Sequence, residues 1–102
     1  MIDLIESHRA ELDALCRKYH VKKLELFGSA ADGTWDPARS DLDFLLEFLP
    51  ETSGRIFDGY FDLKDDLERL FGCKVDLVMP RAIRNRFFLE AVNKQRKLVY
   101  AA

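Results

Sequence analysis

The chain has 102 residues, of which 48% are hydrophobic and 33% charged, and it holds only three prolines and five glycines. This composition predicts a single compact domain over residues 1–102 and excludes disordered, collagen-like and low-complexity proteins. The formal net charge of −2 argues against a globally basic nucleic-acid binder, so we expect no direct nucleic-acid binding.

The first predicted elements are a helix and a strand. Residues 4–19 repeat apolar side chains at three- and four-residue intervals, which predicts an amphipathic helix. Residues 22–27 alternate with a period of two, with leucines on one side, which predicts a strand. That strand runs directly into Gly28 and Ser29.

The second predicted strand has the clearest pattern in the chain. It follows a loop over residues 30–40 that is rich in turn-forming residues. Its core-facing side is defined by alternating apolar positions: Leu42, Phe44, Leu46 and Phe48. Asp41 and Asp43 therefore lie on the opposite face of this strand.

A second helix and a third strand come next. Residues 56–70 carry a helical apolar pattern, which Gly72 ends. Residues 73–79 predict a strand on which Asp76 points away from the apolar side. With the elements that follow, the chain predicts an α+β fold in which about four strands form one sheet flanked by about three helices.

The C-terminal segment is basic and aromatic. Pro80 suits the start of a third helix, whose apolar stripe includes Phe87 and Phe88, and residues 97–100 predict a short edge strand. Residues 81–102 hold six Lys or Arg against one acid, whereas the preceding 80 residues hold 10 against 17. This asymmetry indicates either a solvated helix face or a contact with an anion or an acidic partner.

Two cysteines and the lack of a long apolar run bear on the compartment. Neither Cys16 nor Cys73 stands in a metal-binding or redox spacing, which is typical of reduced, packed thiols in a cytosolic protein. The sequence has no signal-peptide pattern and no apolar window of about 18 residues. We therefore expect a cytoplasmic protein without membrane attachment.

Three carboxylates are predicted to converge on one face of the sheet. Asp41 and Asp43 share a face of the second strand, and Asp76 points the same way from the third strand. Converging carboxylates repel one another and raise each other's pKa values. A divalent cation relieves that repulsion, and Mg²⁺ takes oxygen ligands. The sequence therefore predicts a magnesium site, with room for two metal ions, at these three residues.

Gly28 and Ser29 supply a second part of the candidate site. The glycine permits a sharp strand exit with close ligand approach, and the serine hydroxyl with nearby backbone N–H groups can hold a phosphate oxygen. Metal-binding carboxylates beside a phosphate cradle are the parts needed for phosphoryl or nucleotidyl transfer. Taken singly, each part has a simpler interpretation: a solvated acidic pair, an ordinary turn, or a strand-face charge paired with Lys74.

In this order the motifs resemble those of the polymerase β-type nucleotidyltransferase superfamily, most closely its minimal single-domain (MNT) members. The matching segments are Phe27-Gly28-Ser29, Asp41-Leu42-Asp43-Phe44 and Val75-Asp76-Leu77-Val78. The resemblance implies a palm-like mixed sheet in which Asp41 and Asp43 hold Mg²⁺ and a nucleoside triphosphate. It also implies that Gly28 and Ser29 grip the triphosphate. Asp76 would complete the metal site and help to deprotonate an acceptor hydroxyl.

The resemblance also implies a partner. Minimal members are commonly encoded beside a HEPN-domain toxin and act as antitoxins, and some transfer AMP from ATP onto a tyrosine of that toxin. We therefore expect a Mg²⁺-dependent transferase with a HEPN-domain protein as acceptor. A homo-oligomer is a further expectation, because the aromatic residues exceed what a thin core needs: Trp35, Phe57, Phe87 and Phe88.

One departure from the family pattern leaves alternatives open. Residues 30–33 read Ala-Ala-Asp-Gly, where many minimal members have an Arg-Ala-Arg-Gly-like run. Losing two cations and gaining an acid beside the phosphate site weakens triphosphate binding, because charge-assisted contacts are the stronger ones. One alternative is a weakly active or inactive module that neutralises its partner by contact. Another is a transferase that modifies a small molecule.

Overall fold

The computed structural model describes residues 3–28, 41–50 and 56–102. The strands are β1 (Val21–Phe27), β2 (Leu42–Phe48), β3 (Val75–Val78) and β4 (Lys97–Ala101). The helices are α1 (Asp3–Ser7), α2 (Arg9–Lys18), α4 (Ile56–Phe71) and α5 (Arg86–Gln95), with a 3-10 turn η2 (Pro80–Ala82). This is the predicted α+β fold.

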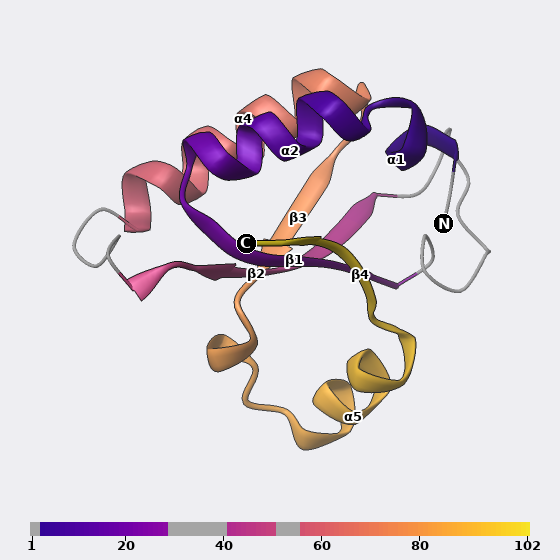
Figure 1. The fold of residues 1–102 in the computed structure, drawn as a ribbon. Helices are drawn as coiled ribbons and strands as arrows, with labels where there is room; N and C mark the ends of the chain where they lie inside the picture. The colour runs from indigo at the N-terminus through magenta and orange to yellow at the C-terminus, as the bar shows by residue number, and fades with distance from the viewer. Residues whose placement is uncertain (1–2, 29–40, 51–55) are drawn as a thin grey trace.

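One mixed sheet organises these elements. Its strand order is β3-β2-β1-β4. β1 runs antiparallel to both β2 and β4, whereas β2 and β3 run parallel. Figure 1 shows α2 and α4 above the sheet and α5 below it. The last predicted strand is therefore confirmed as an edge strand beside β1.

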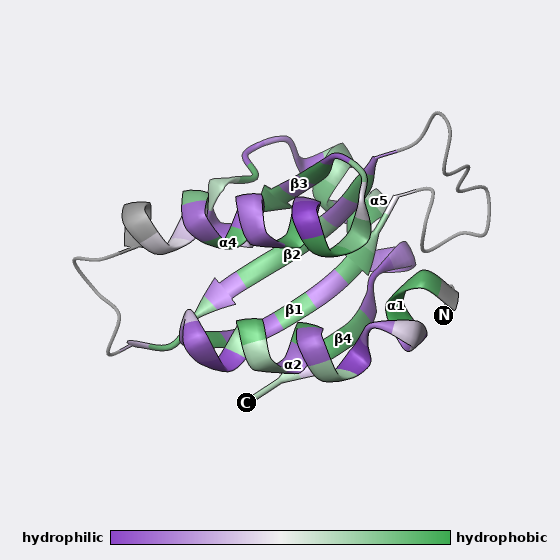
Figure 2. Ribbon diagram, turned by 90° about the horizontal axis from the view of Figure 1, so that it is seen from above, coloured by the Kyte–Doolittle hydropathy of each residue, from purple (hydrophilic) through white to green (hydrophobic). Residues whose placement is uncertain are grey.

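The main core lies between the sheet and the helices above it. The buried side chains include Leu24 and Leu26 of β1, Phe44 of β2, and Leu63 and Leu67 of α4. Figure 2 shows α2 and α4 lying across the sheet, with hydrophobic and hydrophilic residues alternating along both helices. The period-two and helical patterns of the sequence thus assigned these core faces correctly.

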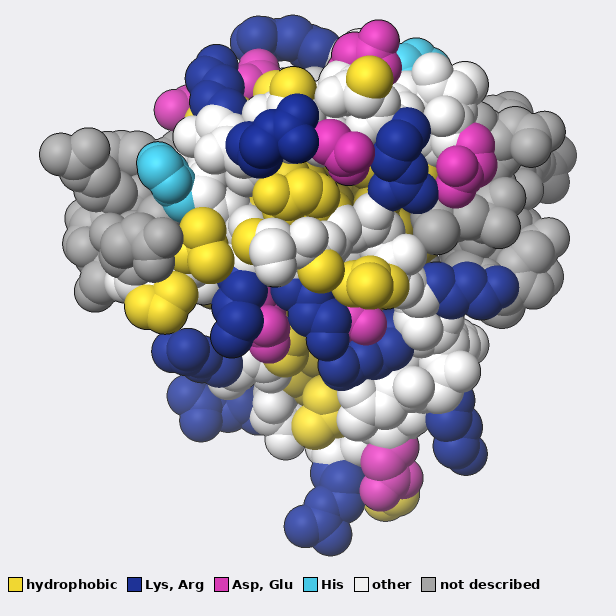
Figure 3. Space-filling model, viewed as in Figure 1, with side chains coloured by type: hydrophobic (Ala, Val, Ile, Leu, Met, Phe, Trp, Pro, Cys, Tyr) yellow, Lys and Arg dark blue, Asp and Glu magenta, His cyan; other side chains and the backbone are white. Residues whose placement is uncertain are grey.

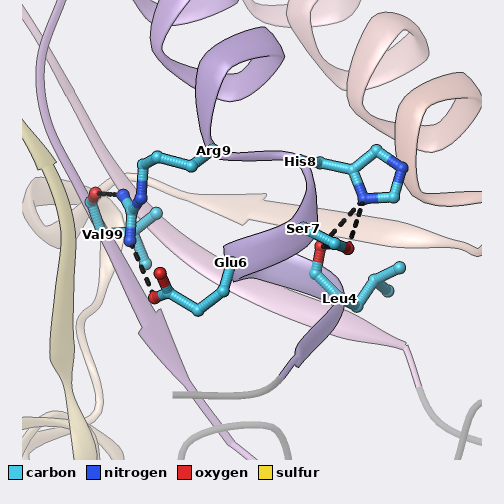
Figure 4. A network of polar contacts seen from close by, with 6 residues as sticks. All are labelled: Leu4, Glu6, Ser7, His8, Arg9 and Val99. Atoms are coloured by element: carbon cyan, nitrogen blue, oxygen red, sulfur yellow. Dashed lines mark hydrogen bonds and ion pairs between the residues drawn. The ribbon is translucent and has the colours of Figure 1, made fainter.

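The predicted helix over residues 4–19 is wrong in one respect, because the chain turns at His8 and forms α1 and α2. His8 Nδ1 lies 2.9 Å from the Leu4 carbonyl oxygen and 3.1 Å from Ser7 Oγ, and its ring packs edge-on against Phe71. Arg9 donates to the Val99 carbonyl of β4 and to Glu6 (Figure 4). These contacts tie the turn to the sheet edge and to α4, which a periodicity of apolar residues cannot predict.

The third helix also begins later than predicted. Pro80 starts η2, and α5 starts only after Asn85, whose side-chain oxygen accepts the backbone N–H groups of Phe87 and Phe88 at 2.9 and 3.1 Å. Val92, which lies four residues after Phe88 on the same face of α5, is the residue that this helix buries. Phe87 is 81% exposed and Phe88 44% exposed, so the predicted apolar stripe is largely open to solvent at these two rings.

A smaller core lies on the α5 side of the sheet. Phe27, Leu45 and Val92 are buried there, with Val78 and Ile83 packed against them. Beside this cluster, β1 buries the carboxylate of Glu25, which is only 8% exposed. Arg96 Nε lies 3.1 Å from that carboxylate and Lys23 Nζ lies 3.5 Å from it. This face of the sheet is therefore both packed and charged.

Replacing Arg96 with Ala should lower the free energy of unfolding by about 2 kcal/mol, because it leaves a buried carboxylate with its weaker partner alone. Arg69→Ala is the matched control, since it removes an exposed guanidinium from its 3.3 Å pair with Asp66 and should cost about 0.5 kcal/mol. Urea unfolding of both variants at neutral pH measures the difference. Equal losses of unfolding free energy in the two variants would show that the buried Glu25 carboxylate does not need Arg96 as its partner.

Cys16 and Cys73 are free, and burial raises the pKa of Cys16 to about 12, as expected for a packed thiol. Among residues 3–28, 41–50 and 56–102, no helix combines the length and apolar character needed to cross a bilayer.

Candidate functional site

The candidate site lies on the α5 side of the sheet, where one row of residues crosses three strands. Phe27 at the end of β1 is the antiparallel partner of Asp43 on β2, and Asp43 is the parallel partner of Asp76 on β3. Partners in a register point to the same face of a sheet. The sequence therefore folds Phe27, Asp43 and Asp76 into neighbouring positions, while Leu42 and Phe44 point into the main core.

Asp43 and Asp76 form a coupled carboxyl pair. Burial raises the pKa of Asp43 to about 6, followed by the charge of Asp76, a hydrogen bond between the two carboxyls and the charge of Asp41. Within the described part of the chain, no Lys or Arg makes an ion pair with any of these three acids. The pair therefore concentrates negative charge that its described neighbours leave uncompensated.

Gly28 lies directly against this pair. Its φ is +73°, a left-handed conformation that favours glycine, and a Cβ built on it would lie 2.5 Å from Asp43 Oδ2. Any side chain here would push the carboxylate from its place. The lack of a side chain at Gly28 therefore lets the Asp43 carboxylate lie against the strand exit.

Asp41 stands slightly apart from the pair. It precedes β2, is half-buried, and its charge raises the pKa of Asp43 and of Cys73. Across the described residues, no group of three or more His, Cys, Asp or Glu side chains is arranged to hold a metal ion. The structure therefore brings Asp43 and Asp76 together, and Asp41 acts on Asp43 through its charge.

Other expected features lie outside the described residues. These are Ser29, the loop over residues 30–40 with its departure from the family pattern, Trp35 and the side chain of Phe57. The prediction that Ser29 contacts phosphate stays a prediction.

Phe88 is a neighbour of the site that the sequence analysis missed. Its ring packs edge-on against that of Phe27, with centroids 6.2 Å apart and an interplanar angle of 77°. The alternation that placed Phe27 on the outer face of β1 was an available signal, because it puts this ring in the same row as Asp43. The late start of α5, which sets the position of Phe88 beside Phe27, has no comparable signal in the sequence.

A family model and a named relative match nearly the whole chain. Residues 9–100 match the family model described as "Nucleotidyltransferase domain". The chain is 36% identical over 98 residues to "Putative protein adenylyltransferase MJ0128" of Methanocaldococcus jannaschii, covering 96% of this chain and 91% of the relative.

Solved structures show the same fold. One described as "Structure of putative minimal nucleotidyltransferase" is 31% identical, with a TM-score of 0.74 and coverage of 94% and 95% of the two chains. A chain in the complex of a tri-AMPylated HEPN toxin from Shewanella oneidensis with MNT antitoxin has a TM-score of 0.61 at 18% identity, covering 96% of this chain and 73% of that one. The second likeness concerns the fold alone. Because the family match spans nearly the whole chain, the protein belongs to the nucleotidyltransferase domain family.

Proposed function

We propose that the protein transfers AMP from ATP onto a hydroxyl group of a protein partner, and that this partner is a HEPN-domain toxin. Two relatives support the acceptor class. The M. jannaschii protein is named "Putative protein adenylyltransferase MJ0128", and the fold neighbour comes from a complex of a tri-AMPylated S. oneidensis HEPN toxin with MNT antitoxin. The observation that carries the proposal is the uncompensated Asp43–Asp76 pair beside Gly28.

The donor set fits a magnesium ion. Asp43 and Asp76 offer only oxygen ligands, and Mg²⁺ is commonly held by one or two carboxylates together with waters and substrate phosphates. Asp41 adds charge to the same site. The bound ion would neutralise the triphosphate and polarise it toward attack. A second ion would also need ligands from the substrate phosphates, because among the described residues only Asp43 and Asp76 come together.

Three residues of the chain would then have separate roles in the transfer: Gly28, Ser29 and Asp76. Gly28 leaves room for the triphosphate to approach the strand end, and Ser29 donates its hydroxyl to a phosphate oxygen. Asp76 accepts the proton of the acceptor hydroxyl. The acceptor oxygen forms a bond to the α-phosphorus of ATP, and the bond to the β-phosphate oxygen breaks, so pyrophosphate leaves.

Labelled ATP tests this function. The pure protein, Mg²⁺ and the protein encoded beside it are incubated with ATP labelled at the α-phosphate, and label should appear on the neighbouring protein. Asp65→Asn, which changes an exposed acid on α4, should transfer as the wild type does. Absence of transfer from every nucleoside triphosphate would contradict the enzymatic proposal.

The Ala-Ala-Asp-Gly run at residues 30–33 favours a second candidate, in which the protein neutralises its partner by contact. The double variant Asp41→Asn/Asp43→Asn separates the two candidates. If transfer carries the function, the variant binds the partner and fails to neutralise it. If contact carries the function, neutralisation survives unchanged.

A further inference from the structure

The row of residues at the site continues onto α5. Phe88 packs against Phe27, which is the register partner of Asp43, and Asp43 is the partner of Asp76. The Phe88 ring of α5 therefore lies next to β1, the strand that pairs with β2 at Asp43. Figure 1 shows α5 on its own side of the sheet, away from α2 and α4.

The two rings of this contact differ in exposure. Phe27 is 6% exposed and belongs to the small core, whereas 44% of Phe88 is open to solvent. The edge-to-face contact fixes the orientation of the Phe88 ring and covers only part of it. A held, partly open aromatic surface beside a charged site is a suitable platform for a planar ligand.

The surroundings of Phe88 are basic. Arg84 and Arg86 flank the capping residue of α5, are exposed, and make no ion pair with another described residue. Figure 3 shows Lys and Arg side chains gathered over the half of the molecule formed by α5 and β4. An anionic ligand is therefore attracted to the region that holds the open ring.

We infer that the exposed surface of Phe88 binds the base of the nucleoside triphosphate. This rests on the proposed function, because it takes the triphosphate to lie at Asp43 and Asp76. Phe27 connects Phe88 to Asp43, because its ring packs against Phe88 and its backbone is the register partner of Asp43. Aromatic side chains stack on bases of every kind, so Phe88 contributes affinity for nucleotides as a class.

Calorimetric titration of the full chain in Mg²⁺ tests this site with two probes, ATP and inorganic tripolyphosphate, which lacks the base. Phe88→Ala should weaken ATP binding about tenfold and leave tripolyphosphate binding unchanged. Phe88→Leu keeps apolar bulk against Phe27 and should weaken ATP binding to a similar extent, which separates stacking from packing.

Phe61→Ala is the matched control. Phe61 is 59% exposed and also lies in an edge-to-face pair, with Tyr60, but it belongs to α4 on the other side of the sheet. It should bind both probes as the wild type does. Unchanged ATP binding by Phe88→Ala, or an equal loss for both probes, overturns the inference. Loss of affinity for the partner protein alone would assign the ring to protein docking and also overturn it. A wild type that binds neither probe contradicts the proposed function as well.

Discussion

Replacing Asp43 with Asn is expected to lower nucleotidyl transfer by about a thousandfold. The substitution keeps the shape of the side chain and removes the charge that neighbours Asp76 and Asp41. A metal ion stabilises transition-state charge by several kcal/mol, and that stabilisation is lost with its ligand. Initial rates with α-labelled ATP measure the loss, with Asp65→Asn as the control. If the variant retains a tenth of wild-type activity, Asp43 does not bind the catalytic metal ion.

The same substitution should stabilise the metal-free protein. The pKa of Asp43 is about 6 in the folded chain and about 3.9 in an unfolded one. Because the folded state holds the proton more tightly, this carboxyl favours folding most below about pH 4, and its contribution is lost as the pH rises through 6. After allowance for solvent screening of a half-buried group, Asp43→Asn should gain about 1 kcal/mol at pH 7.5.

Unfolding in EDTA between pH 4 and 8 measures this gain. The variant and the wild type should have similar stability at pH 4, and the variant should become the more stable as the pH rises past 6. A constant difference across that range would mean that the negative charge of Asp43 costs the folded state nothing.

Gly28→Ala has the second large expected effect. The new methyl group would lie 2.5 Å from Asp43 Oδ2, at a backbone φ of +73°. The left-handed conformation costs a non-glycine residue about 1–2 kcal/mol. The clash also displaces the carboxylate, and a shift of about 1 Å at a reacting site lowers rates roughly a hundredfold. We expect both losses, measured by urea unfolding and by the labelled-ATP assay.

Gly72→Ala separates strain from displacement. Gly72 has a similar φ of +67°, but a Cβ there meets no atom within 4 Å. It should lose similar stability and keep its transfer activity. If both alanine variants lose activity equally, the lower rate is caused by general destabilisation. The contact of Gly28 with Asp43 is then not specifically required for transfer.

Alternation along the strands was enough to predict the core and the outward face shared by Asp43 and Asp76. It placed Phe44 inward and Asp43 outward, and the parallel register of β2 and β3 then brings Asp43 beside Asp76. The prediction that all three acids converge was less accurate, because Asp41 does not form a group of three with Asp43 and Asp76 among the described residues. The position of Asp41 just before β2 depends on where the strand begins, which periodicity determines least closely.

The errors fall where tertiary contacts override local pattern. The break at His8 depends on Arg9 reaching the Val99 carbonyl, which lies 90 positions away along the chain. Phe88 and Val92 lie four residues apart on one face of α5, but only Val92 is buried, and Phe88 contacts Phe27 with 44% of its surface exposed. An apolar stripe predicts which face of a helix packs, and it does not determine how much of that stripe is buried.

The melting temperature of the full chain in EDTA and in Mg²⁺ with ATP tests the central claim most directly. Ligand at about 100 times its Kd adds about 2.7 kcal/mol, which for a domain of this size raises the melting temperature by at least about 10 °C. We expect this rise for the wild type and for Asp65→Asn, and its loss for Asp43→Asn. An equal rise in the Asp43→Asn variant, or no rise in the wild type with any nucleoside triphosphate, would contradict a metal-nucleotide site at Asp43 and Asp76.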